Sequence, residues 1–168
     1  MSPCPYEAAL RAHWRKAAES ATNCATDSAH DLAHIRRVWA NCRAIAKGEG
    51  EGEAQSATID LELLYAAALF HDLVNLPKNA ANRAEASRLS AEAAAPLARA
   101  CGLPEAKIPA LEHAITAHSF SAKIAPQTLE AQILQDADRL DALGAIGLAR
   151  MLMVSGALNR PLYDRNDP

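Results

Sequence analysis

The sequence has few β-branched apolar residues: valine and isoleucine together occur 11 times in 168 residues, whereas alanine occurs 39 times. Because β-branched side chains favour strands and alanine is the best helix former, this composition argues against a sheet. Half of the residues are hydrophobic, which excludes disorder throughout, and the length suits one core. We therefore expect an all-α protein with a single domain over residues 1–168.

The sequence also lacks an excess of positive charge and the common cysteine motifs. Its net charge is −3 and its pI is about 6.1, so it offers no general basic surface for a nucleic-acid duplex. The four cysteines form no C-x-x-C pair, which argues against a zinc knuckle or a redox motif. Reduced thiols are the simplest interpretation, since a disulfide framework is atypical of an alanine-rich helical domain.

Segments that direct a protein to a membrane are missing as well. The N-terminal segment MSPCPYEAALRAHWRKAAES has no apolar core of the kind that a signal peptide needs. No stretch reaches 18 apolar residues without a charge, so the sequence predicts no membrane span. We expect a cytoplasmic protein with no membrane partner.

Apolar periodicity predicts about seven helices, separated by glycine- and proline-containing breaks. The third is apolar nearly all round from Leu61 to Phe70, so it should be a central, buried helix that presents His71 and Asp72 at its C-terminal end. Asp27 or Ser28 can cap the second helix. The expected ranges are 6–23, 27 or 28 to 48, 58 or 60 to 72, 82–100, 109–118, 128–143 and 144–154.

The adjacent pair His71-Asp72 is the first candidate site. A charged aspartate after a buried apolar helix is unfavourable unless it is paired or binds a metal. Imidazole nitrogen and carboxylate oxygen together suit Mn, Fe, Co or Zn better than Ca. Two adjacent side chains can meet at one ion only where the helix ends, as it does here. The alternative is a solvent-facing helix end, and the dipeptide alone does not decide between the two.

Helical phasing selects carboxylate partners for this pair. Leu134, Asp138 and Asp141 share one face of the sixth helix, whereas Asp136 points roughly opposite to Asp138. We therefore expect Asp138 and Asp141 to face inward. A charged, exposed face is the alternative, but the apolar Leu134 on the same stripe counts against it.

Histidines on two other helices complete the set. His34 shares an apolar stripe with Val38, so it faces the core, either as a satisfied core histidine or as a site residue. His30, one turn earlier, could join the site or cap the helix. His118 lies on the apolar stripe of the fifth helix and is preferred to His113, which is turned about 140° away. Convergence of inward polar groups from several helices favours a common site.

On these residues the chain resembles the HD-domain superfamily of metal-dependent phosphohydrolases. The family pattern is a histidine, then His-Asp, then a distant aspartate. It reads here as His34 in AHIRRV, His71-Asp72 in AALFHDLV and Asp138 in LQDADRLDALGAIGLAR. The segments HDLVNLPKN and DADRLDALGAIG are more specific and are typical of the compact, stand-alone bacterial branch. The resemblance extends from about Trp14 to the C-terminus.

The resemblance implies a helical bundle of the HD-domain type. It also implies that His34, His71, Asp72 and Asp138 hold one divalent ion, with Mn favoured among Mn, Fe, Co, Ni, Zn and Mg. Many HD enzymes carry an acidic residue where this chain has Asn75, which cannot act as a general base. Relatives continue through more C-terminal helix, so we expect a shortened member or a truncated chain that lacks part of the pocket wall.

The predicted chemistry is hydrolysis of a phosphoester or phosphoanhydride bond in a phosphorylated small molecule, preferably a nucleotide, by metal-activated water. We expect His118 to bind phosphate or to protonate the leaving oxygen, and Asp141 to orient a ligand or a water. The residues expected to bind phosphate are Lys78, Arg83, Arg37 and Ser87, with an ordinary exposed side chain as the alternative for each cation.

Three other functions fit the sequence less well. The first is hydrolysis of an alarmone or a cyclic nucleotide, although the Gly-Tyr-Pro motif of one cyclic-nucleotide branch is absent. The second is a regulator that binds metal or nucleotide without turnover, which Asn75 and the short C-terminus suggest. A purely structural helical domain is the last alternative. The oligomeric state stays open, with a homodimer as one alternative.

Overall fold

The computed structural model describes residues 5–20, 31–50, 58–76, 81–161, 163 and 166, and this part of the chain contains α- and 3-10 helices but no strand. The prediction of an all-α fold is confirmed. The α-helices are α1 (Pro5–Ser20), α2 (Leu32–Gly50), α3 (Leu61–Phe70), α4 (Ala86–Ala100), α5 (Ile108–His118), α6 (Leu129–Leu140) and α7 (Gly144–Ala157). Three 3-10 turns lie between them: η1 (Arg83–Glu85), η2 (Glu105–Lys107) and η3 (Phe120–Ala122).

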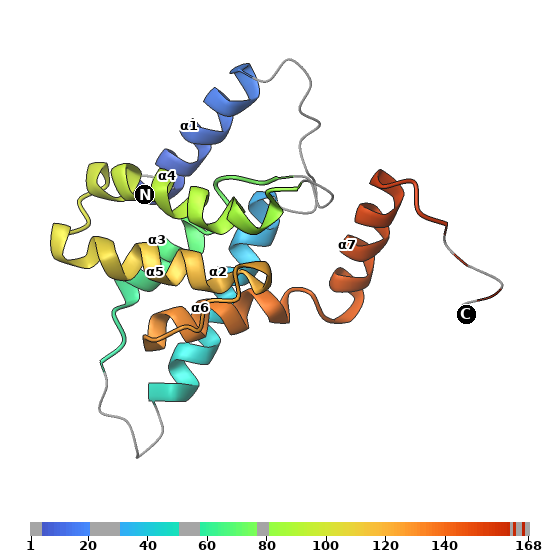
Figure 1. The fold of residues 1–168 in the computed structure, drawn as a ribbon. Helices are drawn as coiled ribbons and strands as arrows, with labels where there is room; N and C mark the ends of the chain where they lie inside the picture. The colour runs from blue at the N-terminus through green and yellow to red at the C-terminus, as the bar shows by residue number, and fades with distance from the viewer. Residues whose placement is uncertain are drawn as a thin grey trace.

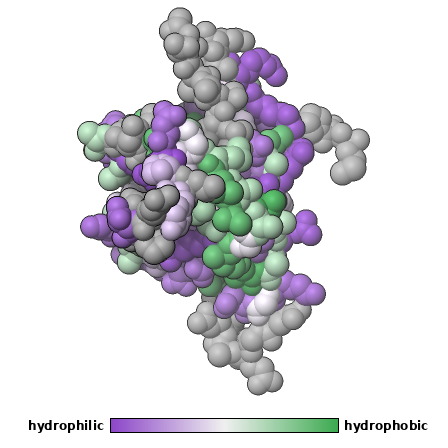
Figure 2. Space-filling model, turned by 90° about the vertical axis from the view of Figure 1, so that its right-hand side faces the viewer, coloured by the Kyte–Doolittle hydropathy of each residue, from purple (hydrophilic) through white to green (hydrophobic). Residues whose placement is uncertain are grey.

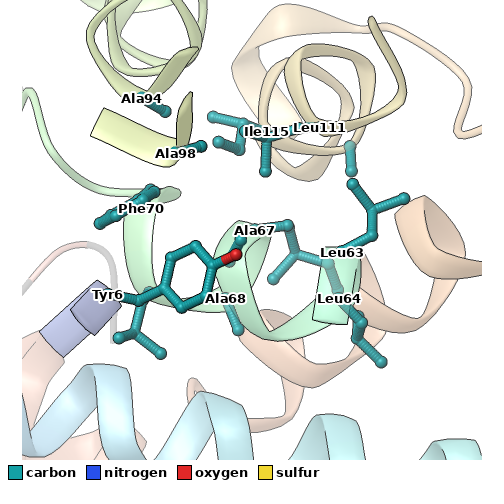
Figure 3. Packing of buried hydrophobic residues seen from close by; sticks show 14 of the residues in the cluster. Tyr6, Leu63, Leu64, Ala67, Ala68, Phe70, Ala94, Ala98, Leu111 and Ile115 are labelled. Atoms are coloured by element: carbon teal, nitrogen blue, oxygen red, sulfur yellow. The ribbon is translucent and has the colours of Figure 1, made fainter. Parts of the chain in front are cut away.

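Helix α3 lies at the centre of the bundle, as its uniform apolar composition predicts. It packs against α1, α2, α4, α5 and α6 (Figure 1). Figure 3 shows Leu63 of α3 beside Leu111 of α5, and Phe70 of α3 on the side of Tyr6 of α1, whose ring centroid lies 6.0 Å from that of Phe70. Because α3 is held on all sides, the residues that follow it have a fixed position.

The N-terminus of α3 is capped by Asp60, one of the two start positions expected from the sequence. The Asp60 carboxylate accepts a hydrogen bond from the Leu63 N–H at 3.1 Å and forms an ion pair with Lys107 at 2.8 Å. Although burial works in the opposite direction, the Lys107 ammonium and the backbone N–H groups hold the pKa of Asp60 below its ordinary value. The carboxylate therefore stays ionised where the helix dipole favours negative charge.

We predict that Asp60→Ala lowers the free energy of unfolding by about 1 kcal/mol, because the Leu63 N–H loses its acceptor. For a chain of this size that corresponds to a fall in Tm of about 2–4 °C. Asp60→Ser keeps a capping oxygen and is expected to recover most of the loss. Differential scanning calorimetry of the three proteins measures the difference, and equal losses in both variants would contradict a capping role.

The start of α2 differs from the expectation in its cap. Asp27 and Ser28 lie outside the described residues. The helix begins at Leu32, and the Asp31 carboxylate accepts a hydrogen bond from the His34 N–H at 2.9 Å. This cap fixes the first turn of α2, the turn that carries His34.

Helix α7 stands apart from the bundle and begins with a close approach to the preceding turn (Figure 1). A Cβ added to Gly147 would lie 2.1 Å from the Ala142 carbonyl oxygen, so only glycine fits there without a shift. Gly144 starts the helix with φ +65°, a conformation that glycine adopts readily. Gly147 thus permits tight contact between α7 and the turn that precedes it. The helix also extends past Val154, to Ala157.

The outer surface of α7 is largely apolar. Six large side chains at its start and along its length are between 43% and 65% exposed: Leu143, Ile146, Leu148, Met151, Leu152 and Met153. Figure 2, which faces the side of the molecule where α7 lies, shows a band of hydrophobic surface. Among the described residues no single helix has the length and composition of a membrane span. Helices α6 and α7 have that length and composition only when they are taken together, and the two helices are bent by 75° relative to each other.

Candidate metal centre

His71 follows the last residue of α3 and has no exposed surface. Its Nδ1–H donates to the Ala68 carbonyl oxygen at 2.9 Å, which leaves Nε2 as the free acceptor of the ring. Burial, the largest influence, lowers the pKa of His71 to about 4. The ring is therefore neutral near pH 7, with a nitrogen lone pair available to a cation.

His34 reaches the same point from α2 and is also fully buried. Its Nδ1–H donates to Asp141 Oδ2 at 2.7 Å, and its Nε2 lies 3.3 Å from Nε2 of His71. Burial alone would lower the pKa of His34, but the carboxylates of Asp72 and Asp141 raise it above its ordinary value. The site thus has a negative field, which favours a proton or a cation between the two rings.

Two carboxylates complete the cluster. Asp72 Oδ2 lies 3.6 Å from His34 Nε2 and 3.5 Å from His71 Nε2. Asp138 Oδ1, from α6, lies 3.4 Å and 3.8 Å from the same two nitrogens. The atoms that His34, His71 and Asp72 offer lie within 4.8 Å of one another, a spacing that suits ligands of a metal ion. Two ligand atoms each about 2.1 Å from one ion lie about 3–4 Å apart, so His34, His71 and Asp72 are spaced to hold one divalent cation, with Asp138 beside them.

Asp141 forms the support behind His34. It is 5% exposed, and it accepts hydrogen bonds from His34 Nδ1, from Arg37 Nε and Nη2 at 2.6 and 3.0 Å, and from Arg150 Nη1 at 2.8 Å. Burial alone would raise the pKa of Asp141, but the bonds from Arg37 and His34 hold it below its ordinary value. An ionised Asp141 fixes the tautomer of His34 in which Nε2 faces the cluster.

The helical phasing of α6 and α5 agrees with the structure. Asp138 and Asp141 reach the cluster while Asp136 is exposed. On α5, His118 is 6% exposed and its Nε2 lies 3.9 Å from Asp72 Oδ1. His113 is partly exposed and accepts a hydrogen bond from the Gln127 N–H, away from the cluster. His118 therefore borders the cluster on the side of Asp72.

A pocket of about 730 Å³ opens beside the cluster. Asp72, Asp138 and His118 line its inner end. One wall is formed by six residues of α7: Gly147, Leu148, Arg150, Met151, Val154 and Ser155. Its remaining lining consists of Arg83, Ser119, Phe120, Ser121, Arg139, Ala142 and Arg160. Of these, only Arg83 was predicted from the sequence as a substrate residue. Arg150 was not predicted as a site residue, but the sequence could have pointed to it, because it is the single charged residue in α7.

The other predicted substrate residues take different positions. The guanidinium of Arg37 binds Asp141, and Arg37 does not line the described pocket. Ser87 is 3% exposed, and its hydroxyl has no hydrogen-bond partner within the described ranges. Arg83 Nη1 donates to the Leu76 carbonyl at 3.1 Å and to Asn75 Oδ1 at 3.4 Å, so Asn75 helps to hold this arginine. Lys78 and His30 lie outside the described residues.

Neither of the two cysteines that the structure describes is among the residues of the cluster. Cys42 is fully buried in the core on α2, where burial, with a smaller effect of the Asp138 charge, raises the pKa of its thiol to about 12. Cys42 is a free thiol, and Cys101 is partly exposed at the C-terminal end of α4. Histidine nitrogens and carboxylate oxygens are thus the only described donors at the cluster, a set typical of Mn, Fe, Co and Zn sites.

Comparison with known proteins agrees with this arrangement. A family model described as the HD domain matches residues 31–143. The YpgQ protein of Bacillus subtilis (strain 168) is 36% identical over 140 residues, which cover 81% of this chain and 62% of YpgQ. The chain thus spans less than two thirds of the length of that relative.

Solved structures of other proteins have a similar fold. A crystal structure of a Lactobacillus plantarum protein has a TM-score of 0.66 at 30% identity, covering 98% of this chain and 69% of that one. The crystal structure of YpgQ in complex with ADP has a TM-score of 0.65 at 28% identity. The match covers 96% of this chain and 73% of the YpgQ chain. A Listeria innocua protein, Lin1889, has a TM-score of 0.60 at 27% identity. The match covers 96% of this chain and 71% of the Lin1889 chain.

Proposed function

The chain belongs to the HD-domain family, and on this premise we propose that it is a metal-dependent phosphohydrolase that cleaves a phosphoester or phosphoanhydride bond of a nucleotide. The observation that carries the proposal is the convergence of two buried histidine nitrogens and two carboxylates, from α2, the end of α3 and α6, at the inner end of a pocket. We further propose that residues 1–168 form one HD domain.

In this proposal His34, His71, Asp72 and Asp138 hold one divalent ion, with Mn favoured. Such an ion supplies a Lewis acid, which lowers the pKa of a bound water and polarises a phosphoryl group. Asp141 orients His34 through the bond to Nδ1 and remains ionised because Arg37 and Arg150 balance its charge. The protein therefore contributes a rigid, pre-oriented set of ligands.

His118 and the pocket arginines contribute the remaining roles. His118 Nδ1 is bound to the Ile115 carbonyl oxygen, so Nε2 is the atom that faces Asp72 and the pocket. From there it can bind a phosphate oxygen or give a proton to the leaving oxygen. Arg83, held by Asn75 and the Leu76 carbonyl, is positioned to bind phosphate. We also keep the prediction of phosphate binding for Lys78, Arg37 and Ser87.

Support for a nucleotide comes from the pocket and from one relative. YpgQ was solved in complex with ADP, and it shares the fold at 28% identity. The pocket volume of about 730 Å³ lies within the range for drug-sized ligands, well above what an isolated phosphate fills. A nucleotide is therefore a better match than inorganic phosphate or a small phosphomonoester.

The test is a metal analysis followed by a substrate screen. We expect the purified protein to retain a divalent ion, measured by mass spectrometry, and to hydrolyse nucleoside di- or triphosphates when Mn²⁺ is added. Phosphorus NMR of the products identifies the bond cleaved, because phosphate and pyrophosphate give separate signals. Binding of metal and ADP without release of phosphate or pyrophosphate would favour the alternative of a regulator without turnover, which Asn75 suggests. Absence of both binding and release would overturn the proposal.

A further inference from the structure

Phe120 is the most exposed large hydrophobic residue in the described part of the chain, with 83% of its surface accessible. It lies in η3, directly after α5 and two residues after His118. Single exposed apolar residues are common on proteins and need no explanation by themselves. Phe120 differs from an isolated exposed residue because it lines the pocket whose inner end is the candidate metal centre.

The turn that carries Phe120 has a defined shape. The hydroxyls of Ser119 and Ser121 lie 2.9 Å apart, and the Ala122 N–H donates to the Ser119 carbonyl at 3.2 Å. Lys123 ends the turn with φ +55°, and η3 packs beside η1, which carries Arg83. The ring of Phe120 thus projects from a short, internally bonded turn next to the turn that carries Arg83. An aromatic ring on such a turn is presented to a ligand at little cost in conformational entropy.

The charge of the pocket lining is arranged for an extended anion. Four arginines line it, Arg83, Arg139, Arg150 and Arg160, against the two candidate ligands Asp72 and Asp138. Arg150 is bound to Asp141. Arg139 and Arg160 form no ion pair within the ranges that the structure describes, and both are exposed. In a protein with net charge −3, this local excess of arginine favours a phosphate chain that starts at the metal centre.

We propose that Phe120 is the platform on which the planar base of the nucleotide stacks, so that this residue makes the pocket prefer nucleotides to other polyphosphates. The inference rests on the proposed function and adds the residue that determines specificity. A phosphate chain bound by the arginines ends at a sugar and a base, and Phe120 is the one phenylalanine, tyrosine or tryptophan among the residues that line the described pocket. Because every base has a π-face, stacking alone predicts broad tolerance of the base.

The test compares ADP with inorganic tripolyphosphate, which carries phosphates but no base, in the presence of Mn²⁺. Phe120→Ala should raise the dissociation constant for ADP by about 5- to 150-fold relative to that for tripolyphosphate, the effect of losing one base–aromatic stack. Phe120→Trp should restore ADP affinity, and its fluorescence, after subtraction of the wild-type signal from Trp14 and Trp39, should be quenched by ADP but not by tripolyphosphate. The KM values for the two substrates should follow the same ratio.

Ile124→Ala is the matched control, since Ile124 is an exposed apolar residue of the same loop that does not line the pocket. It should leave the ratio of the two dissociation constants unchanged. If Phe120→Ala weakens both ligands equally, or neither, Phe120 does not bind the base and the inference alone is wrong. A change in sedimentation without a change in this ratio would identify Phe120 as a contact between copies and also overturn it. Wild-type protein that neither binds nor cleaves any nucleotide would refute the proposed function itself.

Discussion

Replacing Asp72 with asparagine should remove the bound metal and lower kcat/KM for the nucleotide substrate by about 1,000-fold or more, because metal catalysis supplies several kcal/mol of transition-state stabilisation. Asp72 Oδ2 lies 3.5 Å and 3.6 Å from the two histidine Nε2 atoms. The amide keeps the size of the side chain but not its charge, so the two neutral imidazoles and Asp138 must hold the ion with one carboxylate fewer. Metal content by mass spectrometry and steady-state kinetics with added Mn²⁺ measure the two effects.

The matched control is Asp136→Asn, the same substitution on an exposed carboxylate of α6 that faces away from the cluster. It changes the net charge of the protein by the same amount and should leave metal content and kcat/KM close to the wild-type values. The assignment of Asp72 would be wrong if its asparagine variant kept a full complement of metal, or if both substitutions reduced activity to the same extent.

Replacing Asp141 with asparagine is expected to weaken metal affinity by about 10- to 100-fold, although all four proposed ligands remain. The amide cannot serve all the donors that the carboxylate accepts from His34, Arg37 and Arg150, so the ring of His34 is no longer fixed. We also expect the free energy of unfolding to fall by about 2 kcal/mol, less than for a fully buried pair, because the Arg37 side chain is 36% exposed. Calorimetric titration with Mn²⁺ and thermal unfolding measure the two losses separately.

Arg37→Met separates orientation from stability. This variant removes two of the bonds to Asp141 but keeps the contact between Asp141 and His34, together with the bond from Arg150. It should lower Tm while metal affinity stays nearly unchanged. Equal losses of metal affinity in the Arg37 and Asp141 variants would mean that Asp141 acts through general stability rather than by orienting His34.

Much of the fold follows from local patterns in the sequence. The high alanine content and the scarcity of β-branched residues predict helices, and the apolar run of α3 predicts its burial. Helical phasing also distinguishes Asp138 from Asp136 and His118 from His113, because residues three, four or seven apart share a helix face. These predictions hold because each depends on positions within one helix.

Contacts between distant segments were not predictable in the same way. For Arg37 the sequence predicted phosphate binding, but it carried no sign that the guanidinium binds Asp141, which lies 104 positions later in the chain. The wall formed by α7, with Gly147 against Ala142, depends on the 75° bend between α6 and α7. Phe120, Arg139 and Arg160 carry no helical periodicity that marks them as pocket residues.

Composition, periodicity and motifs suffice to predict an all-α protein with a buried central helix that ends at His71-Asp72, and to choose His34 and Asp138 as the partners of that pair. The contact of Asp141 with His34, the two arginines that bind Asp141, and the pocket lined by arginines and Phe120 depend on tertiary packing. Helix periodicity is local and follows from residue spacing, whereas the partner of a charged side chain depends on how separate helices pack.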